Sequence, residues 1–418
     1  MGKTLSREAE ILKIFEEVEK EYGEGVVQLA DDIPRQVIRI PSGNFATDVE
    51  MGGGTPIGRW GSIRSERESA GKTNWCIHQV RQYTDRGIYI IWVDGENVIE
   101  GNIQHYADAG VNLKYMILVF GEKAEVMAEV GLKFIKKGLV GALFLDSVQS
   151  LLIDVEDEKE FEEGQGNVGM KKANFMAGVT RKYIFHSRAR LINTEKDNDT
   201  LKRNCITLFS IDRLNAKIKM TGFSKFTEYI ATGGQHKENA YSWKLRITQA
   251  EWLKVSSGDT EISYAQATKF ITEKNKTFSR RRKSRYNLHF RNYDGYTAGQ
   301  IDNLESVVRL GLKYEVLNKL TKKDAGDKTK SEKGKKSGWV QYGKYKFNGK
   351  KNIIKLPKNI ICDIMLDIID KVNPDCIYFD EVDTVAGRKI FFNSYFPKCY
   401  NWNFIEEKSK KGRRKRLG

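Results

Sequence analysis

The chain has 418 residues, of which 40% are hydrophobic and 30% are charged, and its formal net charge at pH 7 is +16. This length exceeds a typical domain and predicts a large core with smaller modules. No apolar run is long enough to cross a bilayer, and residues 1–8 lack an apolar signal-type stretch, so we expect a cytoplasmic protein without membrane contact. The five cysteines form no CxxC pair, which disfavours a zinc or disulfide framework. The positive surplus makes nucleic acid the first partner to consider.

The predicted elements begin with an amphipathic helix over residues 8–22, which ends at Gly23. A glycine-rich stretch follows to about residue 57. From residue 58 to about 250, apolar β-rich runs alternate with helical stretches, which indicates an α/β layer with a largely parallel sheet. Buried strands are predicted over residues 88–93, 141–145 and 205–209. Ligands of such folds bind at the carboxyl ends of the strands.

The character of the sequence changes after Asn275. A basic cluster occupies residues 280–285, and an apparent helix covers about 297–322. Residues 321–338 are poor in apolar side chains, and seven basic side chains lie between Lys408 and Arg416. The basic cluster is interpreted as a surface that gathers duplex DNA or as a solvated charge cluster. The tail is interpreted as a DNA contact, a targeting signal or a basic tail without further function.

A candidate phosphate loop ends in Ser69-Ala70-Gly71-Lys72-Thr73, between a strand-like stretch over 60–63 and a helical run over 75–83. In this context the N–H groups at a helix N-terminus face an anion, a lysine reaches the outer phosphates and a threonine hydroxyl binds magnesium. Lys72 and Thr73 are therefore the first candidates for binding ATP and Mg²⁺. The full motif has glycine where Glu66 stands, so the match is partial and an ordinary helix N-cap stays open.

Two apolar strands deliver carboxylates to the same predicted sheet edge. Glu96 follows the run that ends in Val93-Asp94, about two dozen residues after the loop, and is a candidate for orienting or deprotonating the attacking water. Asp146 follows Leu143-Phe144-Leu145 and suits a magnesium contact of the Walker B kind. Either carboxylate alone is also typical of a strand cap.

These motifs, with the segments 18–25, 37–44, 51–59 and 337–342, resemble the RecA family of DNA recombinases over about residues 10–370. The resemblance implies an α/β fold: a RecA-like P-loop ATPase core with an N-terminal helix and a smaller α+β C-terminal domain. It implies an ATP- and Mg²⁺-dependent enzyme that self-associates into a helical filament on single-stranded DNA and pairs it with double-stranded DNA. A bacterial or phage-infected cell is the expected setting.

The resemblance also assigns site residues. Glu96 falls on the catalytic glutamate, and Lys72 is the second residue given a catalytic role. Thr73 and Asp146 fall on the magnesium ligands. Lys274 and Lys276 fall on paired lysines that reach the ATP of an adjacent subunit. The nucleotide-binding set that it implies is Glu68, Ser69, Ala70, Gly71, Lys72, Thr73, Asn74, Glu100, Arg213, Lys274 and Lys276.

Two DNA-binding loops are implied as well, near residues 164–182 and 214–234. Glycines, lysines and phenylalanines in them suit a single strand, through phosphate contacts and base stacking. For Phe223 and Phe226, anchoring of the loop stays an alternative. The DNA-binding set is Gly166, Asn167, Val168, Gly169, Met170, Lys171, Lys172, Lys217, Lys219, Phe223, Lys225, Phe226, Thr232, Gly233 and Gly234.

Four units follow: residues 1–45, an N-terminal helix and oligomerisation segment; 46–275, the ATPase core with both DNA loops; 276–372, the C-terminal domain; and 373–418, an extension with a basic tail. The chain departs from the family at Glu66, and at Asp212 and Arg213, where the family carries an amide that senses the γ-phosphate. Arg213 remains a candidate phosphate contact, whereas Asp212 does not. A hexameric helicase or motor of the same fold, and a non-catalytic DNA-binding filament protein, are the alternative functions.

Overall fold

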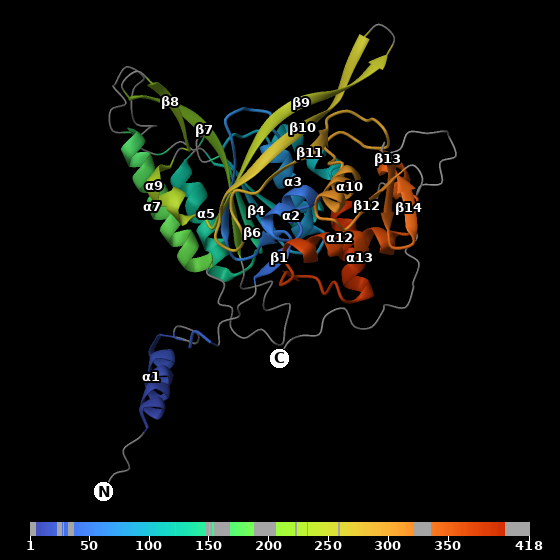
Figure 1. Cartoon of the computed structure of the whole chain (residues 1–418). Coiled ribbons are helices and arrows are strands. Elements are labelled where there is room, and N and C mark those ends of the chain that lie inside the picture. The colour runs from blue at the N-terminus through green and yellow to red at the C-terminus, as the bar shows by residue number, and fades with distance from the viewer. Residues whose placement is uncertain are drawn as a thin grey trace, which may run out of the picture.

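The computed structural model describes residues 6–22, 27, 29–31, 37–121, 123–147, 150, 153, 168–187, 206–221, 224–231, 233–257, 260–321 and 336–397. Its centre is a mixed, mostly parallel sheet with helices on both faces (Figure 1). The strand order is β11-β10-β9-β3-β7-β6-β4-β5, and β8 pairs with β7 outside this path. Its strands are β3 (Trp60–Ser65), β4 (Ile90–Asp94), β5 (Met116–Val119), β6 (Ala142–Asp146), β7 (Thr207–Thr221), β8 (Ser224–Ala231), β9 (Trp243–Ser257), β10 (Thr260–Asn275) and β11 (Lys283–His289).

Alternate residues of the buried strands enter two different apolar cores. Trp92 and Phe144 face the core that contains α3 (Lys72–Thr84), whereas Val93 and Leu143 face the core that contains α5 (Ala124–Lys137) and α7 (Val168–Ser187). This follows from the two-residue period of a strand that is buried on both faces. The predictions over 88–93, 141–145 and 205–209 are thereby confirmed as buried strands. β7 is much longer than expected.

An aromatic stack crosses the middle of the sheet. The rings of Trp92 and Phe144 lie 5.3 Å apart at 12°, and those of Phe144 and Phe209 lie 4.3 Å apart at 3°. Trp243 of β9 then meets Phe209 edge-on at 5.9 Å. Gly61 of β3 leaves the room that this indole occupies. The stack therefore ties four strands of the sheet together beneath the loop that follows β3.

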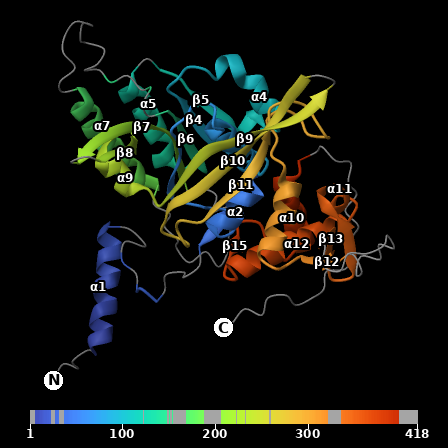
Figure 2. The same ribbon diagram turned by 45° about the horizontal axis from the view of Figure 1, so that its top comes forward.

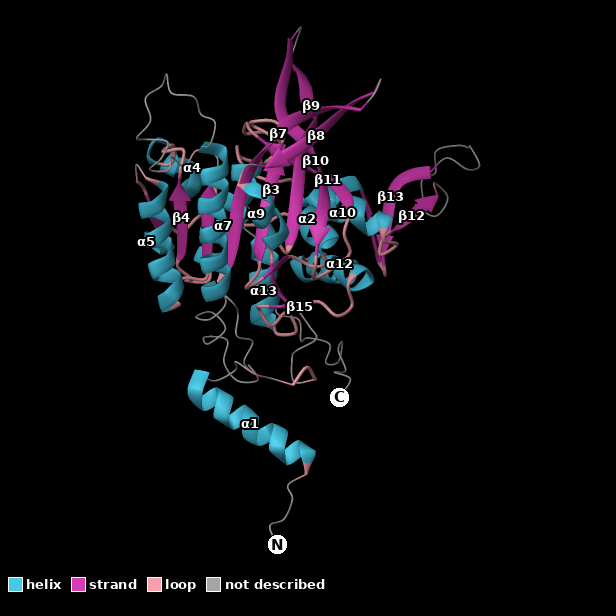
Figure 3. Ribbon diagram, turned by 90° about the vertical axis from the view of Figure 1, so that its left-hand side faces the viewer, coloured by secondary structure: helices cyan, strands magenta, loops and turns pink. Residues whose placement is uncertain are grey.

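Two long hairpins leave the body at one end, as Figure 3 shows. β7 pairs in parallel with β3 only as far as Arg213, opposite Ser65, and then continues as an antiparallel hairpin with β8. β9 likewise runs parallel to β3 and continues into an antiparallel hairpin with β10. Because β3 ends at Ser65, both hairpins extend past the sheet edge where the candidate phosphate loop begins.

Short elements complete the core and the chain ends. They are β1 (Ile38–Ile40), α2 (Phe45–Met51), β2 (Thr55–Pro56), η1 (Glu100–Asn102), α4 (Ile103–Asp108), η2 (Leu113–Tyr115) and α9 (Gly234–Ala240). The N-terminal helix α1 (Arg7–Tyr22) was predicted correctly. It has no buried residue and lies apart from the core in both Figure 1 and Figure 2.

The C-terminal part is a small antiparallel sheet with helices. Its elements are α10 (Asn303–Lys313), β12 (Asn318–Thr321), β13 (Lys336–Tyr342), β14 (Tyr345–Asn348), α11 (Gly349–Ile353), α12 (Lys358–Val372), β15 (Ile377–Tyr378) and α13 (Val385–Tyr395). The helix expected over 297–322 is wrong in its bounds, because the chain turns after α10 and residues 318–321 form a strand. No described helix is long and apolar enough to span a membrane.

Strand pairing crosses two of the predicted boundaries between units. β11, assigned to residues 276–372, is the edge strand of the central sheet beside β10. β15, assigned to the extension 373–418, pairs in parallel with β1, and Tyr395 of α13 packs edge-on against Phe45. The division into four units remains a prediction. The basic tail over 408–416 lies outside the described residues.

Gly61→Ala is expected to lower the free energy of unfolding by about 1–3 kcal/mol, the usual cost of overpacking a filled core. A Cβ at this position would lie 1.9 Å from Cε2 and Cζ2 of Trp243. Chemical denaturation of the full chain measures the change. Gly178→Ala in α7 is the matched control, because a Cβ there meets nothing within 4 Å, and stability should stay equal or rise slightly. Wild-type stability in Gly61→Ala would contradict the packing described.

Candidate functional site

The candidate site lies at the sheet edge where the parallel pairing of β3, β4, β6 and β7 ends. Ser65 of β3 is level with Arg213 of β7, and Asp146 of β6 is level with Asp94 of β4 and Ile211 of β7. The segment 66–71 joins β3 to the N-terminus of α3. The sheet therefore brings together the loop and both carboxylate-bearing strands that the sequence predicted.

The loop enters α3 through backbone conformations that favour glycine. Gly71 is the N-cap residue at φ 96°, and Ser69 is also in the left-handed region at φ 57°. Ala70 is buried at the base of the loop, where its carbonyl accepts from Gln266 Nε2 at 3.5 Å. The loop thus turns sharply into the helix whose first residues are Lys72 and Thr73, as a phosphate loop does.

Lys72 and Thr73 both lie beside Asp146. Thr73 Oγ1 is 3.4 Å from Asp146 Oδ2, and Lys72 Nζ donates to the carbonyl of Arg67 at 3.3 Å. Burial, together with the charges of Glu96 and Asp94, raises the pKa of Asp146 to about 7, and Lys72 and Thr73 offset part of this rise. Burial also lowers the pKa of Lys72. Positive charge from a metal ion would relieve the crowding of carboxylates here.

Glu96 and Asp94 have different roles in the turn after β4. Asp94 is buried and its carboxylate accepts from the backbone N–H groups of Glu96 and Ile99, so it shapes the turn. Glu96 is exposed, and its Oε1 accepts from Ser147 at 3.0 Å and Ser150 at 3.2 Å. The catalytic candidate is therefore held beside Asp146 by hydroxyls.

The donor set fits Mg²⁺ better than a metal held by protein alone. Among the described residues, no three His, Cys, Asp or Glu side chains gather as a metal site. Magnesium commonly takes one or two protein oxygens and completes its shell with water and substrate phosphates. A hydroxyl and a carboxylate beside a phosphate loop are such a pair.

The other nucleotide candidates lie around this centre with partners of their own. Glu68 forms an exposed ion pair with Arg213, which places Arg213 beside the loop. A phosphate contact of Arg213 stays a prediction. Asn74 Nδ2 donates to the carbonyl of Gly299 at 3.1 Å. Glu100 is exposed in η1, and no described contact joins it to Lys72 or Asp146.

Lys274 and Lys276 lie away from the phosphate loop of their own chain. Lys274 pairs in register with Lys244, which is level with Ser62 near the start of β3. Its Nζ donates to the carbonyls of Glu238 and Asn239, at 3.2 and 3.0 Å. Burial, with the charges of Lys276 and Lys244, lowers the pKa of Lys274 to about 8.

The predicted DNA loops are only partly described. The second one is largely a β-hairpin rather than an irregular loop, because β7 and β8 pair from Leu214 with Ala231 to Thr221 with Ser224. Its role in DNA binding stays a prediction. Gly233 and Gly234 form the start of α9, both at positive φ. In the first loop, Met170 and Lys171 are exposed near the start of α7 and Lys172 is half-buried.

Several of these candidates fall outside what the structure describes. Gly166, Asn167, Phe223 and Thr232 lie outside the described residues. For five further residues the backbone is in a helix or strand but the side chain lies outside the description: Val168, Lys217, Lys219, Lys225 and Phe226. Gly169 belongs to the same turn of α7 as Val168.

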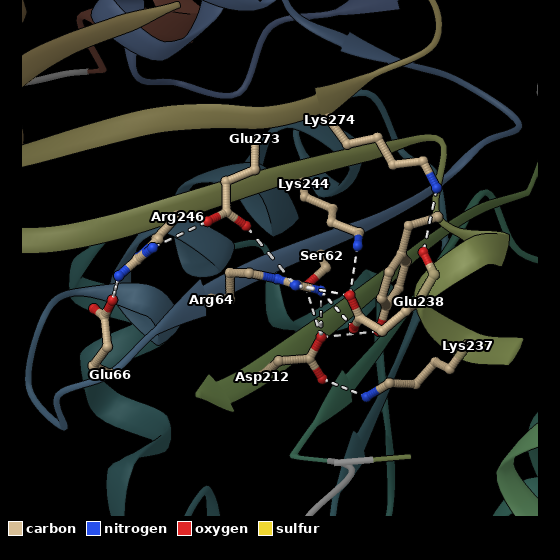
Figure 4. A network of polar contacts seen from close by, with 11 residues as sticks. Ser62, Arg64, Glu66, Asp212, Lys237, Glu238, Lys244, Arg246, Glu273 and Lys274 are labelled. Atoms are coloured by element: carbon tan, nitrogen blue, oxygen red, sulfur yellow. Dashed lines mark hydrogen bonds and ion pairs between the residues drawn. The ribbon is translucent and has the colours of Figure 1, made fainter. Parts of the chain in front are cut away.

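A charge network that the sequence did not predict lies beside the loop (Figure 4). Asp212 is fully buried, and it accepts from Ser62 at 2.6 Å, Lys237 at 2.8 Å and Tyr241 at 2.9 Å. Arg64 lies 3.6 Å from it and binds Glu238 through both terminal nitrogens. Local sequence gave no signal for this, because the partners come from distant elements.

The comparisons with known proteins agree with this architecture. The model of the RecA N-terminal domain matches residues 9–292, more than half of the chain. The chain belongs to the RecA family. Among curated relatives, it is 25% identical to Protein RecA of Gloeobacter violaceus over 346 residues, 82% of this chain and 80% of the relative. It is 33% identical to Protein RecA of Levilactobacillus brevis over 179 residues, 42% of this chain and 46% of the relative. With Protein RecA of Lactococcus lactis subsp. cremoris it shares 29% over 262 residues, 62% of each chain.

Asp212→Asn is expected to lower the free energy of unfolding by about 3–5 kcal/mol at neutral pH, because it leaves the buried charge of Lys237 unpaired. Burial alone would raise the pKa of Asp212, but Lys237 and Arg64 hold it below its ordinary value. A carboxyl with a lowered folded pKa stabilises above its unfolded pKa, near 3.9, and loses this contribution as the pH falls through the folded pKa. The difference between wild type and variant should therefore shrink below about pH 4.

Urea titrations from pH 3 to 7 measure this difference. Glu261→Gln removes an exposed ion pair with Lys254 and is the matched control, for which little change is expected. A difference that stays constant down to pH 3, or wild-type stability in Asp212→Asn at pH 7, would contradict a buried ionised aspartate.

Proposed function

We propose that this RecA-family protein is an ATP-dependent DNA recombinase. In this proposal a helical filament forms on single-stranded DNA, binds MgATP between subunits and pairs the strand with homologous double-stranded DNA. The observation that carries it is the convergence of Lys72, Thr73, Asp146 and Glu96 at one sheet edge, directly beside the β7–β8 hairpin. A net charge of +16 supports a polyanionic partner.

The proposed roles follow from the geometry. The N-terminus of α3 and Lys72 bind the phosphates, and Thr73 and Asp146 hold Mg²⁺. Mg²⁺ when bound neutralises charge on the β- and γ-phosphates. Glu96, held by Ser147 and Ser150, orients the attacking water and accepts its proton.

Two features of the chain support self-association. Ile11, Leu12 and Ile14 of α1 are each more than two fifths exposed, and no residue of this helix is buried against its own core. Lys274 and Lys276 lie away from their own phosphate loop, so a neighbour's nucleotide is the partner that we propose for them. A head-to-tail contact of this kind builds a filament when it does not close.

Lys72→Ala is expected to abolish nucleotide binding, whereas Glu96→Gln should retain binding and reduce DNA-stimulated hydrolysis by about 10²–10⁴-fold, the usual contribution of a general base. ATP hydrolysis with and without single-stranded DNA, and binding of a fluorescent ATP analogue, measure the two effects. Asp85→Asn at the opposite end of α3 is the matched control and should behave as wild type.

Unchanged, DNA-independent hydrolysis in all variants would overturn the recombinase proposal. DNA binding that survives Lys72→Ala in a wild type without ATPase activity would favour a non-catalytic filament protein. Closed rings with DNA and ATP in electron micrographs would favour a helicase-like motor.

Mixing two inactive variants tests whether the nucleotide site is shared between subunits. Lys72→Ala lacks the loop lysine, and the double variant Lys274→Ala/Lys276→Ala lacks the reaching pair. A mixed filament contains interfaces in which an intact loop meets an intact lysine pair, so hydrolysis should reappear on mixing. Mixing Lys72→Ala with Glu96→Gln is the control, because both lie on the same side of the interface and no mixed interface is complete. ATP hydrolysis at the background rate in both mixtures would contradict a nucleotide site shared between subunits.

A further inference from the structure

Glu66 does not point its charge at the phosphate site. Its carboxylate forms an ion pair with a terminal nitrogen of Arg246 on β9, and the Glu66 side chain is 16% exposed (Figure 4). The pair joins the first residue of the loop to a strand 180 positions later in the chain. Because Arg246 is level with Arg64 of β3, the guanidinium lies at the sheet edge where the loop departs.

Arg246 has two further partners from different elements. Its other terminal nitrogen lies 3.3 Å from Glu273 Oε1, on β10 directly before Lys274. Its guanidinium carbon lies 5.2 Å from the ring centroid of Tyr229 on β8, within the range of a cation–π contact. One side chain thus contacts the phosphate loop, the β7–β8 hairpin and the strand that carries Lys274.

The contact of Arg246 with Glu273 is connected to the buried charge network around Asp212. Glu273 also lies 3.9 Å from Arg64, which binds Asp212 and Glu238 in the buried network. Lys237 and Asp212 have no exposed surface, so this end is held by charges that are costly to separate. Apart from Arg246, no described contact links Glu66 or Tyr229 to this buried network, and Tyr229 is 43% exposed. These two are the contacts free to change.

We propose that Arg246 is the positioning residue that couples DNA on the β7–β8 hairpin to the conformation of the phosphate loop, through Tyr229 on one side and Glu66 on the other. The inference rests on the function proposed above and deepens it. A shift of β8 on binding a strand moves Tyr229 relative to the guanidinium. The ion pair between Arg246 and Glu66 is then strengthened or weakened, and this changes the backbone conformation at the start of the phosphate loop. Coupling of this kind is reciprocal, so nucleotide must change DNA affinity by the same factor.

The test measures that factor directly on the full chain. The Kd of a fluorescein-labelled oligothymidylate is measured with and without Mg²⁺ and a non-hydrolysable ATP analogue, and the ratio of the two values is the coupling factor. For wild type we expect a ratio in the usual allosteric range of about 5–150. Arg246→Gln and Glu66→Gln should bring the ratio to within about 2-fold of unity, with Tyr229→Leu in between.

Two comparisons separate coupling from a general structural effect. The double variant Glu66→Gln/Arg246→Gln should lower the ratio no further than Arg246→Gln alone, because both single changes break the same Glu66–Arg246 contact. Lys254→Gln, which removes an exposed ion pair farther along β9, should retain the wild-type ratio. If Arg246→Gln does not fold, Glu66→Gln and Arg246→Lys still report on the same contact.

A wild-type ratio in folded Arg246→Gln or Glu66→Gln would overturn this inference and leave the proposed function intact. Wild-type protein that binds neither the nucleotide analogue nor the oligonucleotide would overturn both. Additive losses in the double variant would also overturn it, because they would assign the two residues to separate effects.

Discussion

The buried negative charge of Asp212 is the constraint on which the candidate site depends. A carboxylate without exposed surface is tolerated only when cations and hydrogen-bond donors surround it. Lys237, Arg64, Ser62 and Tyr241 supply these partners from α9, β3 and the segment before β9. The strand that leads into the phosphate loop and the strand that leads into the β7–β8 hairpin are therefore fixed to each other at one buried point.

An arginine on the strand beside β3 explains why an acidic residue is compatible with the phosphate loop. In the sequence, Glu66 stands where the motif has glycine, and an acid among phosphates is unfavourable. In the fold, Arg64 and Arg246 lie on adjacent strands, and Glu66 and Glu273 pair with Arg246. Arg246 of β9 neutralises the acid, so the loop retains the turn at Gly71 and the partly exposed N-terminus of α3.

What the sequence could predict was local. The strands near 88–93 and 141–145 were visible because unbroken apolar runs signal burial on both faces. The placement of Lys72, Thr73, Glu96 and Asp146 followed, since parallel strands bring their carboxyl ends to one edge. The network around Asp212 and Arg246 was not predictable, because its members lie far apart in the chain and belong to no local pattern; Glu66 and Arg246, for example, are 180 positions apart.

The errors have the same origin. The region after Phe209 looks like a polar loop, yet its residues pair with β8, and pairing between segments leaves no period in either one alone. The helix expected to reach 322 ends near Lys313, because the chain folds back and Leu317 packs where a Cβ on Gly311 would lie, at 2.6 Å. Tertiary contacts decided both outcomes.

The β7–β8 and β9–β10 hairpins flank the candidate site on both sides of β3. β7 and β9 flank β3 and both continue past the point where β3 ends, so the phosphate loop lies between the bases of two projecting ribbons. An amide that senses a phosphate must touch it directly. In the coupling proposed here, the Arg246 guanidinium needs no contact with the phosphate, because it would respond to movement of the β7–β8 hairpin through Tyr229. In this proposal the ion pairs of Glu66 with Arg246, and of Asp212 with Arg64 and Lys237, take the place of a single polar side chain at the nucleotide.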